Sequence, residues 1–148
     1  MDWSPDWEDL FSASGSLAMA GWAALILLPR RPFLLLVLRQ GVVLLLSLFY
    51  AGLILAYFFT VPGGFGSLAE LRQLFASEPL LLAGWVHYLA FDLFVGGWIA
   101  ARADALGVSR LVQAPILLAT FLFGPIGLVL WWGAASGLAM RARRVPTC

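Results

Sequence analysis

Long apolar runs separated by short polar clusters dominate the chain. Four runs approach or exceed the roughly 20 mostly apolar residues that a membrane-spanning helix needs, and they cover residues 10–28, 37–60, 80–101 and 115–133. Backbone polar groups in lipid must pair within their own segment, and runs of this length do not suit the strands of a barrel. The pattern therefore predicts an all-α integral membrane protein, in which four transmembrane helices form a small bundle and residues 1–148 form one membrane domain.

Polar residues and prolines predict where these helices begin and end. Residues 29–31, Pro-Arg-Arg, close the first run, and Pro115 suits the first turn of the fourth helix because its missing N–H would be unpaired there anyway. Gly124-Pro125 predicts a kink inside the fourth helix. Two starts are possible for the second helix, since Arg39 and Gln40 lie either at its beginning or inside a longer, tilted span.

The connection over residues 62–79 predicts a short helix between helices 2 and 3. Ser67 followed by Glu70 fits a capping box, and the apolar residues at 68, 71, 74 and 75 then fall on one helical face. Such a helix would lie in the membrane interface. A plain surface connector is the alternative.

Composition supports a membrane protein and excludes a nucleic-acid partner. The chain is 62% hydrophobic and 11% charged, with a net charge of +1 and a mean hydropathy of +0.94, whereas soluble domains are nearer a quarter charged. Its basic residues are all arginines in short clusters, which leaves no basic face for nucleic acid. A single cysteine, Cys148, allows no disulfide within the chain.

The N-terminal segment predicts a retained first helix and a bacterial inner membrane. The first 29 residues hold no lysine or arginine but four acidic residues, the reverse of a signal or transit peptide. Four spans would place both termini on one side of the membrane. The arginines flanking the spans are nearly balanced between the two sides, so the orientation stays open.

The third run carries both of the candidate catalytic residues, His87 and Asp92, in "GWVHYLAFDLFVGGWIAAR". Asp92 falls near mid-membrane, where an ionised aspartate costs roughly 2.5 to 3.5 kcal/mol. Ionisable groups at that depth usually serve a functional site. In the structural alternative, Asp92 links helices through a hydrogen bond to Tyr88 or Arg39, and His87 only reaches the membrane interface.

Helical geometry separates the two candidates. At about 100° per residue, Trp85, Tyr88 and Asp92 share one face, while His87 lies about 140° round the helix, on the face of Phe91 and Phe94. The two are not a ready-made dyad. They can line the same cavity if each faces it from a different side of the helix, or if a nearby helix contributes a polar side chain. The candidates for that side chain are Gln40, Tyr50, Tyr57 and Gln113.

Several other chemistries find no support in the sequence. One histidine and one buried carboxylate predict no metal site, and the "GGFG" segment lacks the lysine and hydroxyl residue of a phosphate loop. Interface belts explain the tryptophans more simply than a pigment pocket does; the residues concerned are Trp3, Trp7, Trp22, Trp85, Trp131 and Trp132. Small residues four apart, Gly52 with Ala56 and Gly133 with Gly137, are candidates for tight helix crossings.

The segments "LLAGWVHYLAFDLFVGGWIA" and "LVQAPILLATFLFGPIGLVLWW" closely resemble the abscisic-acid-deficient-four-like membrane proteins. The resemblance also takes in "GWAALILLPRR" and "GGFGSLAELRQLF", and so covers about residues 10 to 140. Plant members of that family are required for making neoxanthin from violaxanthin. Family members often carry an arginine where this chain has Gly97, which removes one partner for Asp92.

The resemblance implies four membrane helices and a carotenoid or related isoprenoid as the apolar ligand. Matched by motif, it indicates Trp85, His87, Asp92, Leu93 and Phe94 in the third helix, and Phe123, Gly124, Pro125 and Gly127 in the fourth. Conversion of an epoxide end group to an allenic alcohol is an isomerisation that needs an acid and a base but no cofactor. Asp92 is then the expected acid and His87 the expected base, or the reverse. Trp85, Tyr88, Phe94, Phe123, Gly124 and Pro125 are the expected substrate-binding residues.

Two other functions stay open at this stage. The first is a non-catalytic subunit that binds a pigment, a lipid or an enzyme partner in the membrane through its small and aromatic residues. The second is a proton- or solute-conducting bundle, which rests on Asp92 alone and would call for a homo-oligomer. All three functions have the lipid bilayer as the surrounding partner.

Overall fold

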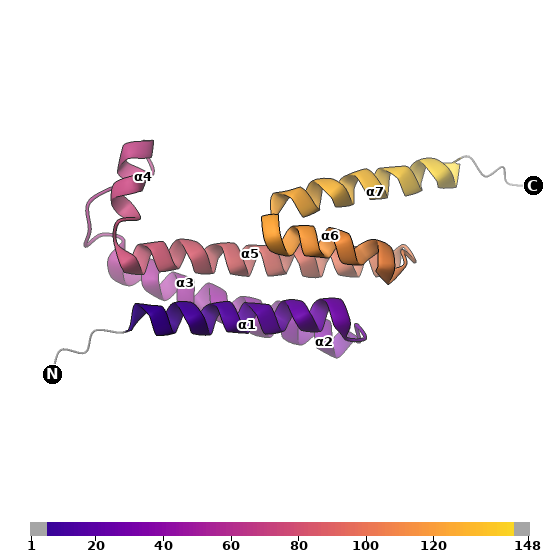
Figure 1. Cartoon of the computed structure of the whole chain (residues 1–148), viewed down its shortest axis with the longest axis horizontal. Coiled ribbons are helices and arrows are strands. Elements are labelled where there is room, and N and C mark those ends of the chain that lie inside the picture. The colour runs from indigo at the N-terminus through magenta and orange to yellow at the C-terminus, as the bar shows by residue number, and fades with distance from the viewer. Residues whose placement is uncertain (1–5, 144–148) are drawn as a thin grey trace, which may run out of the picture. The chain divides into compact units, whose positions relative to one another are not determined.

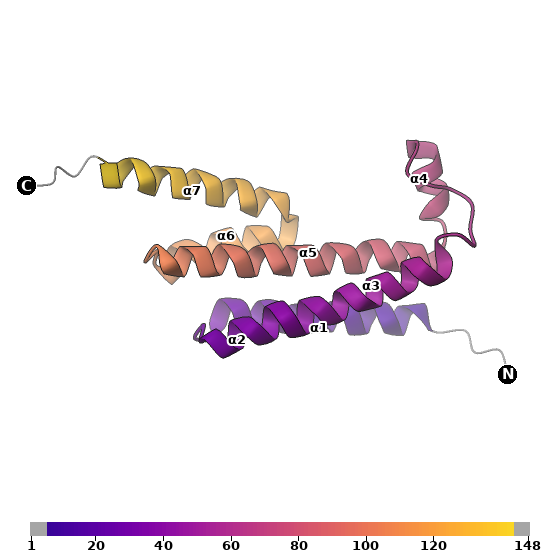
Figure 2. The same cartoon turned by 180° about the vertical axis from the view of Figure 1, so that it is seen from behind.

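Helices are the only regular elements in the part of the chain that the structure describes (Figures 1 and 2). This computed structural model describes residues 6–143, except for the side chains of Arg39 and of residues 138–143. The chain forms two compact units, residues 1–93 and residues 94–148. One long helix, α5 (Glu78–Ala105), contributes to both units.

The first helix, α1 (Trp7–Leu27), begins where Asp6 caps it. One carboxylate oxygen of Asp6 accepts hydrogen bonds from the backbone N–H groups of Glu8, at 3.0 Å, and Asp9, at 3.3 Å, which satisfies donors that a helix start leaves free. Buried residues recur at helical spacing along one face: Ser14, Ala18, Gly21, Trp22 and Leu25. The helix is long and apolar enough to cross a membrane, close to the predicted span.

The second apolar helix runs from residue 32 to residue 57, and its start distinguishes between the two predicted alternatives. It consists of α2 (Pro32–Leu36), a π-helical stretch η1 (Val37–Val42) and α3 (Val43–Tyr57), which together form an apolar helix of 26 residues. Arg39 and Gln40 lie within the π-helical stretch, so the longer span is the correct alternative. The side chain of Arg39, a suggested partner of Asp92, lies outside the described residues.

The predicted short helix between the second and third crossings is present as α4 (Leu68–Leu74). The hydroxyl of Ser67 accepts a hydrogen bond from the N–H of Glu70 at 3.2 Å, and the Glu70 carboxylate accepts one from the N–H of Gly66 at 3.1 Å. The apolar face is only partly buried, since Leu74 is 1% exposed and Leu68 is 67% exposed. The place of α4 in the membrane interface stays a prediction.

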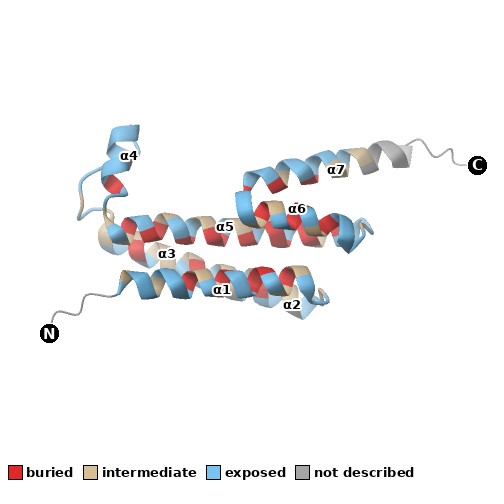
Figure 3. Ribbon diagram, in the orientation of Figure 1, coloured by how far each residue is buried: buried red, intermediate tan, exposed pale blue. Residues whose placement is uncertain are grey.

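The core of the first unit joins α1, α3 and α5. Ala18 of α1, Leu46 and Leu53 of α3, and Ala83 and Val86 of α5 belong to one buried cluster (Figure 3).

Gly21 is a point of close approach between α1 and α5. A Cβ atom on Gly21 would lie 2.9 Å from a methyl of Leu93, which is itself buried. The small residue therefore allows the two helices to meet closely, as is common in lipid, where van der Waals packing drives helix association. Gly52, a candidate crossing residue, has nothing within 4 Å of such a Cβ among the described residues.

The predicted fourth helix is instead two helices. In the second unit, α6 (Arg110–Phe123) and α7 (Pro125–Arg143) are separated by Gly124, whose φ of +49° is a left-handed value that residues with a side chain rarely adopt. The turn is tight, because a Cβ on Gly127 would lie 2.5 Å from the backbone nitrogen of Thr120. The expected kink is thus a full break, and α7 folds back along α6 (Figures 1 and 2).

The start of α6 also differs from the prediction. It begins at Arg110, and Pro115 lies inside it. Buried Gln113 fixes this start, since its side-chain amide donates hydrogen bonds to an Asp104 carboxylate oxygen at 2.8 Å and to the Val108 carbonyl at 2.7 Å. Pro115 lacks a backbone N–H, but a helix tolerates this at the cost of one backbone hydrogen bond, so the proline does not have to begin the helix.

Three helices within the described residues are long and apolar enough to cross a membrane: Trp7–Leu27, Pro32–Tyr57 and Glu78–Ala105. α6 is apolar, but its 14 residues extend only about 21 Å, less than the roughly 30 Å of a hydrocarbon core. The membrane character is therefore confirmed, but the bundle of four spanning helices is not.

Candidate functional site

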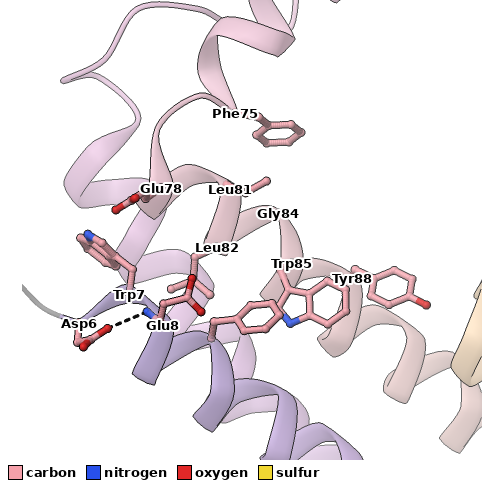
Figure 4. A pocket seen from close by; sticks show the side chains of 11 residues that line it. Asp6, Trp7, Glu8, Phe75, Glu78, Leu81, Leu82, Gly84, Trp85 and Tyr88 are labelled. Carbon is pink, nitrogen blue, oxygen red and sulfur yellow. Dashed lines mark hydrogen bonds between the residues drawn. The ribbon is translucent and has the colours of Figure 1, made fainter.

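A cavity of about 900 Å³ opens in the first unit where α1 and α5 begin (Figure 4). Its volume falls within the range of small-molecule sites, roughly 300 to 1,000 Å³. The residues that line it come from the start of α1, from the end of α4 and from the first three turns of α5: Asp6, Trp7, Glu8, Phe11, Phe75, Glu78, Leu81, Leu82, Gly84, Trp85 and Tyr88. We call it the α1–α5 pocket.

Aromatic rings form one side of this pocket. Trp85 and Tyr88 are one helical turn apart on α5 and stack with ring centroids 5.5 Å apart and planes 27° apart. Phe11 of α1 packs against Trp85 at 5.3 Å. Such a wall offers apolar contact and π-stacking to a flat, conjugated ligand.

Carboxylates form the outer end of the pocket. Asp6, Glu8 and Glu78 line it, and its described lining includes no arginine, lysine or histidine. Figure 4 shows these carboxylates grouped at one end, while the Tyr88 hydroxyl points away from them. The outer end therefore offers hydrogen-bond acceptors, and the inner end is bounded by Tyr88, whose hydroxyl is hydrogen-bonded to Asp92.

Asp92 lies one helical turn beyond Tyr88, at the middle of α5. The two side chains are hydrogen-bond partners. One carboxylate oxygen of Asp92, Oδ2, is buried and has no hydrogen-bond partner among the described residues. Because buried polar atoms are nearly always paired in folded proteins, an orphaned oxygen of this kind calls for an explanation.

His87 lies on a different surface of α5. Its side chain is exposed in the first unit and contacts the rings of Tyr50, with centroids 5.3 Å apart, and Phe91, with centroids 4.6 Å apart. It is not among the residues that line the α1–α5 pocket. His87 and Asp92 thus have different neighbours, as the helical geometry predicts, and the role of His87 as a base stays a prediction.

Comparison with known proteins now identifies the family. The sequence profile of the ABA DEFICIENT 4-like family matches residues 9–131. The chain belongs to this family. None of the curated proteins and none of the solved structures compared with it matches.

Membership of the ABA DEFICIENT 4-like family confirms the resemblance found in the sequence. It relates the chain to the proteins of neoxanthin synthesis and, together with the three long apolar helices, identifies a membrane protein.

The structure brings together only some of the predicted site residues of this ABA DEFICIENT 4-like chain. Of the six predicted substrate-binding residues, Trp85 and Tyr88 line the α1–α5 pocket. The other four belong to the second unit: Phe94 and Phe123 are exposed, and Gly124 and Pro125 form the break between α6 and α7. A substrate-binding role for these four stays a prediction.

Other lining residues were missed by sequence reasoning. Asp6, Glu8, Phe75 and Glu78 lie at the ends of elements that are far apart in the sequence, and only their proximity to the ends of apolar runs could have drawn attention to them.

The predicted tryptophans differ in their surroundings. Trp7 and Trp85 line the pocket, Trp22 and Trp131 are buried, and Trp132 is exposed, and their place in an interface belt stays a prediction. Trp3 lies outside the described residues.

Proposed function

We propose that this ABA DEFICIENT 4-like protein binds the end group of a carotenoid or a related isoprenoid in the α1–α5 pocket and isomerises it. The family relation to neoxanthin synthesis supports the ligand class. The apolar, aromatic wall of the pocket suits a conjugated hydrocarbon. Its opening beside membrane-spanning helices suits a ligand that arrives from the bilayer.

The observation that carries the proposal is the buried oxygen of Asp92. A carboxylate at the middle of a spanning helix is costly. Asp92 is hydrogen-bonded to Tyr88, and its Oδ2 is buried and unpaired among the described residues. A purely structural tie between helices would be expected to use both oxygens. An unpaired oxygen instead suits a group that exchanges a proton with a ligand.

The Tyr88–Asp92 pair supplies both of the proton transfers that the isomerisation needs. The Tyr88 hydroxyl donates its proton to the epoxide oxygen as the carbon–oxygen bond breaks. Asp92 lies one turn beyond Tyr88 and outside the pocket lining, so the end group of the ligand must reach past Tyr88. Oδ2 of Asp92 then accepts a proton from the neighbouring carbon, whose C–H electron pair forms the new double bond of the allene. The proton returns from Asp92 to Tyr88 through their hydrogen bond, so that substrate and product have the same atoms and no electron carrier is consumed.

His87 is the alternative base for this reaction. Its imidazole lies against Tyr50 and Phe91, away from the lining of the pocket. A ligand that uses His87 must therefore lie on that outer surface of α5, or reach it from the pocket. The two arrangements differ in which substitution abolishes product formation, Tyr88→Phe or His87→Ala.

A pigment-binding or interaction subunit without catalysis is the second candidate. It is favoured by the open space around Gly52, Gly133 and Gly137, where a Cβ atom would meet nothing within 4 Å. Small residues with free space beside them suit a partner helix in the membrane. In that case the pocket would hold its ligand unchanged.

Turnover of a defined carotenoid by the purified protein tests the proposal. The protein is reconstituted into vesicles with an epoxy-carotenoid. The pigments are then separated by chromatography, and their molecular masses are determined by mass spectrometry. The proposal expects a new pigment of unchanged mass. Quenching of tryptophan fluorescence by the carotenoid without any new pigment would instead favour the pigment-binding subunit.

A further inference from the structure

His87 of α5 is a metal-ligating side chain that is not among the residues lining the α1–α5 pocket. It lies about 7 Å from the midpoint of α5, because fewer than five residues separate it from that point. Since a hydrocarbon core is roughly 30 Å thick, this position lies within the core when α5 spans the membrane. The His87 side chain is nevertheless exposed in the first unit.

Two aromatic rings from two helices hold the imidazole in place. The ring centroid of Phe91, one turn further along α5, lies 4.6 Å from that of His87, with 31° between the planes. The ring centroid of Tyr50, on α3, lies 5.3 Å away, with 54° between the planes. These ring contacts are the interactions found for the His87 side chain within the described part of the chain, and no hydrogen bond is among them.

An imidazole without a hydrogen bond is costly at this depth. A neutral imidazole has one N–H donor and one nitrogen lone pair, and the lipid tails around a spanning helix satisfy neither. Ionisable groups within spanning segments usually mark a functional site. The lone pair of His87 therefore calls for an electron-pair acceptor that is itself soluble in the membrane.

A metal ion at the centre of a flat tetrapyrrole meets this requirement. The macrocycle supplies four nitrogen ligands of its own, so a single histidine, too few for a metal ion held by protein alone, completes a five-coordinate centre. Neutral imidazole is the commonest metal ligand in proteins and the proximal ligand of many haem proteins. The macrocycle is otherwise apolar and aromatic, and it can pack against Phe91, which is 58% exposed, and against the half-buried Tyr50.

We propose that His87 is the axial ligand of a metal-containing tetrapyrrole, which lies on the surface of α3 and α5 with Phe91 and Tyr50 beside it. All three residues belong to the first unit. A metal that takes up the imidazole lone pair leaves none for a base, so this site is separate from the proton transfers assigned to Tyr88 and Asp92. The proposal does not rest on the isomerase function.

Absorption spectroscopy of the purified full chain in detergent tests this site with three probes: haem b, zinc protoporphyrin IX and metal-free protoporphyrin IX. The affinity tag contains no histidine, so His87 is the single histidine present, and Cys148→Ser removes the thiol as a second ligand for haem iron. Axial coordination is expected to shift the main absorption band of haem b and of the zinc porphyrin. Metal-free protoporphyrin has no axial position, so it reports apolar binding alone.

His87→Phe in this Cys148→Ser chain keeps an aromatic ring beside Phe91 and Tyr50 but removes the nitrogen. The proposal expects it to lose both shifts and still bind metal-free protoporphyrin as the Cys148→Ser chain does. Equal shifts with and without His87, or no shift of either metal probe in the Cys148→Ser chain, would overturn the proposal.

Rescue by free imidazole keeps the test decisive if His87→Phe disturbs the fold. His87→Ala leaves room for imidazole beside Phe91 and Tyr50, so we expect added imidazole to restore the haem b shift at concentrations that leave His87→Phe unchanged. Absence of this rescue would show that the nitrogen at residue 87 is not the ligand.

Discussion

Tyr88 and Asp92 are one turn apart on α5, and the pair connects the α1–α5 pocket to the middle of a spanning helix. Tyr88 lines the pocket and stacks on Trp85, whereas Asp92 lies deeper and keeps one oxygen unpaired among the described residues. The i, i+4 spacing of the two residues predicts this proximity from the sequence. The unpaired oxygen could not be predicted, since it depends on what the other helices place nearby.

Substitution of Tyr88 by Phe tests the proton donor at this scale. Tyr88→Phe keeps the ring that stacks on Trp85 but removes the hydroxyl, so we expect turnover to fall by about 10²-fold or more while carotenoid binding is retained. Trp85→Leu is the contrasting variant, since it removes stacking area and is expected to weaken binding more than turnover of the bound ligand.

Steady-state kinetics in vesicles, with binding followed by tryptophan fluorescence, separates these two effects. Unchanged turnover in Tyr88→Phe would remove Tyr88 from the reaction, and a loss of turnover in His87→Ala alone would transfer the role of base to His87.

At the scale of the helices, close packing depends on glycines other than those with the four-residue spacing. The motifs with four-residue spacing, Gly52 with Ala56 and Gly133 with Gly137, are candidates for crossings, yet the three glycines have open space beside them within the described residues. Gly21 and Gly127 have the close neighbours instead. Spacing alone cannot distinguish these cases, because small residues four apart are common in apolar helices and only the partner helix decides which are used.

Gly21→Val is expected to destabilise the α1–α5 crossing by about 1 to 3 kcal/mol, because the added methyl groups meet the buried Leu93 side chain. Gly52→Val introduces the same residue into a spanning helix with free space beside it and serves as the matched control. Thermal unfolding in detergent measures both. Equal melting temperatures for the two variants would show that the crossing does not depend on Gly21.

Gly127→Ala is expected to open the turn between α6 and α7, because its Cβ would collide with the Thr120 backbone, which cannot rotate away as a side chain can. Gly133→Ala in the same helix adds the same atom where there is free space. We expect a lower melting temperature, or increased cleavage near residue 124 by an added protease, for Gly127→Ala only. Identical behaviour of the two variants would contradict the tight turn.

At the scale of the whole molecule, the lengths of the apolar runs predict three of the crossings to within a few residues. The second of them begins earlier than expected, because Arg39 and Gln40 lie inside it. The sequence predicts a kink at Gly124 and not a reversal, since apolarity continues from Phe123 to Ile126 and a hydropathy pattern has the same form for a bent helix and for a hairpin. The α1–α5 pocket could not be predicted, because its residues come from the ends of three separate elements.

The family relation supplies the ligand class, whereas the chemistry rests on one carboxylate of the chain. Two facts make Asp92 the residue on which the account depends: its place at the middle of α5 and its buried, unpaired Oδ2. A role in helix packing and a role in proton transfer predict different behaviour for a variant that keeps the shape of the side chain.

The most direct measurement is therefore turnover of an epoxy-carotenoid in vesicles by Asp92→Asn, compared with the wild-type chain and with Asp9→Asn, whose exposed carboxylate lies outside the pocket lining. We predict that Asp92→Asn reaches the membrane and that the carotenoid still quenches its tryptophan fluorescence. The variant forms the isomeric product at least about 10²-fold more slowly than the wild type, whereas Asp9→Asn forms it at the wild-type rate. Product formation by Asp92→Asn at the wild-type rate would contradict the account and leave Asp92 as a polar contact between helices.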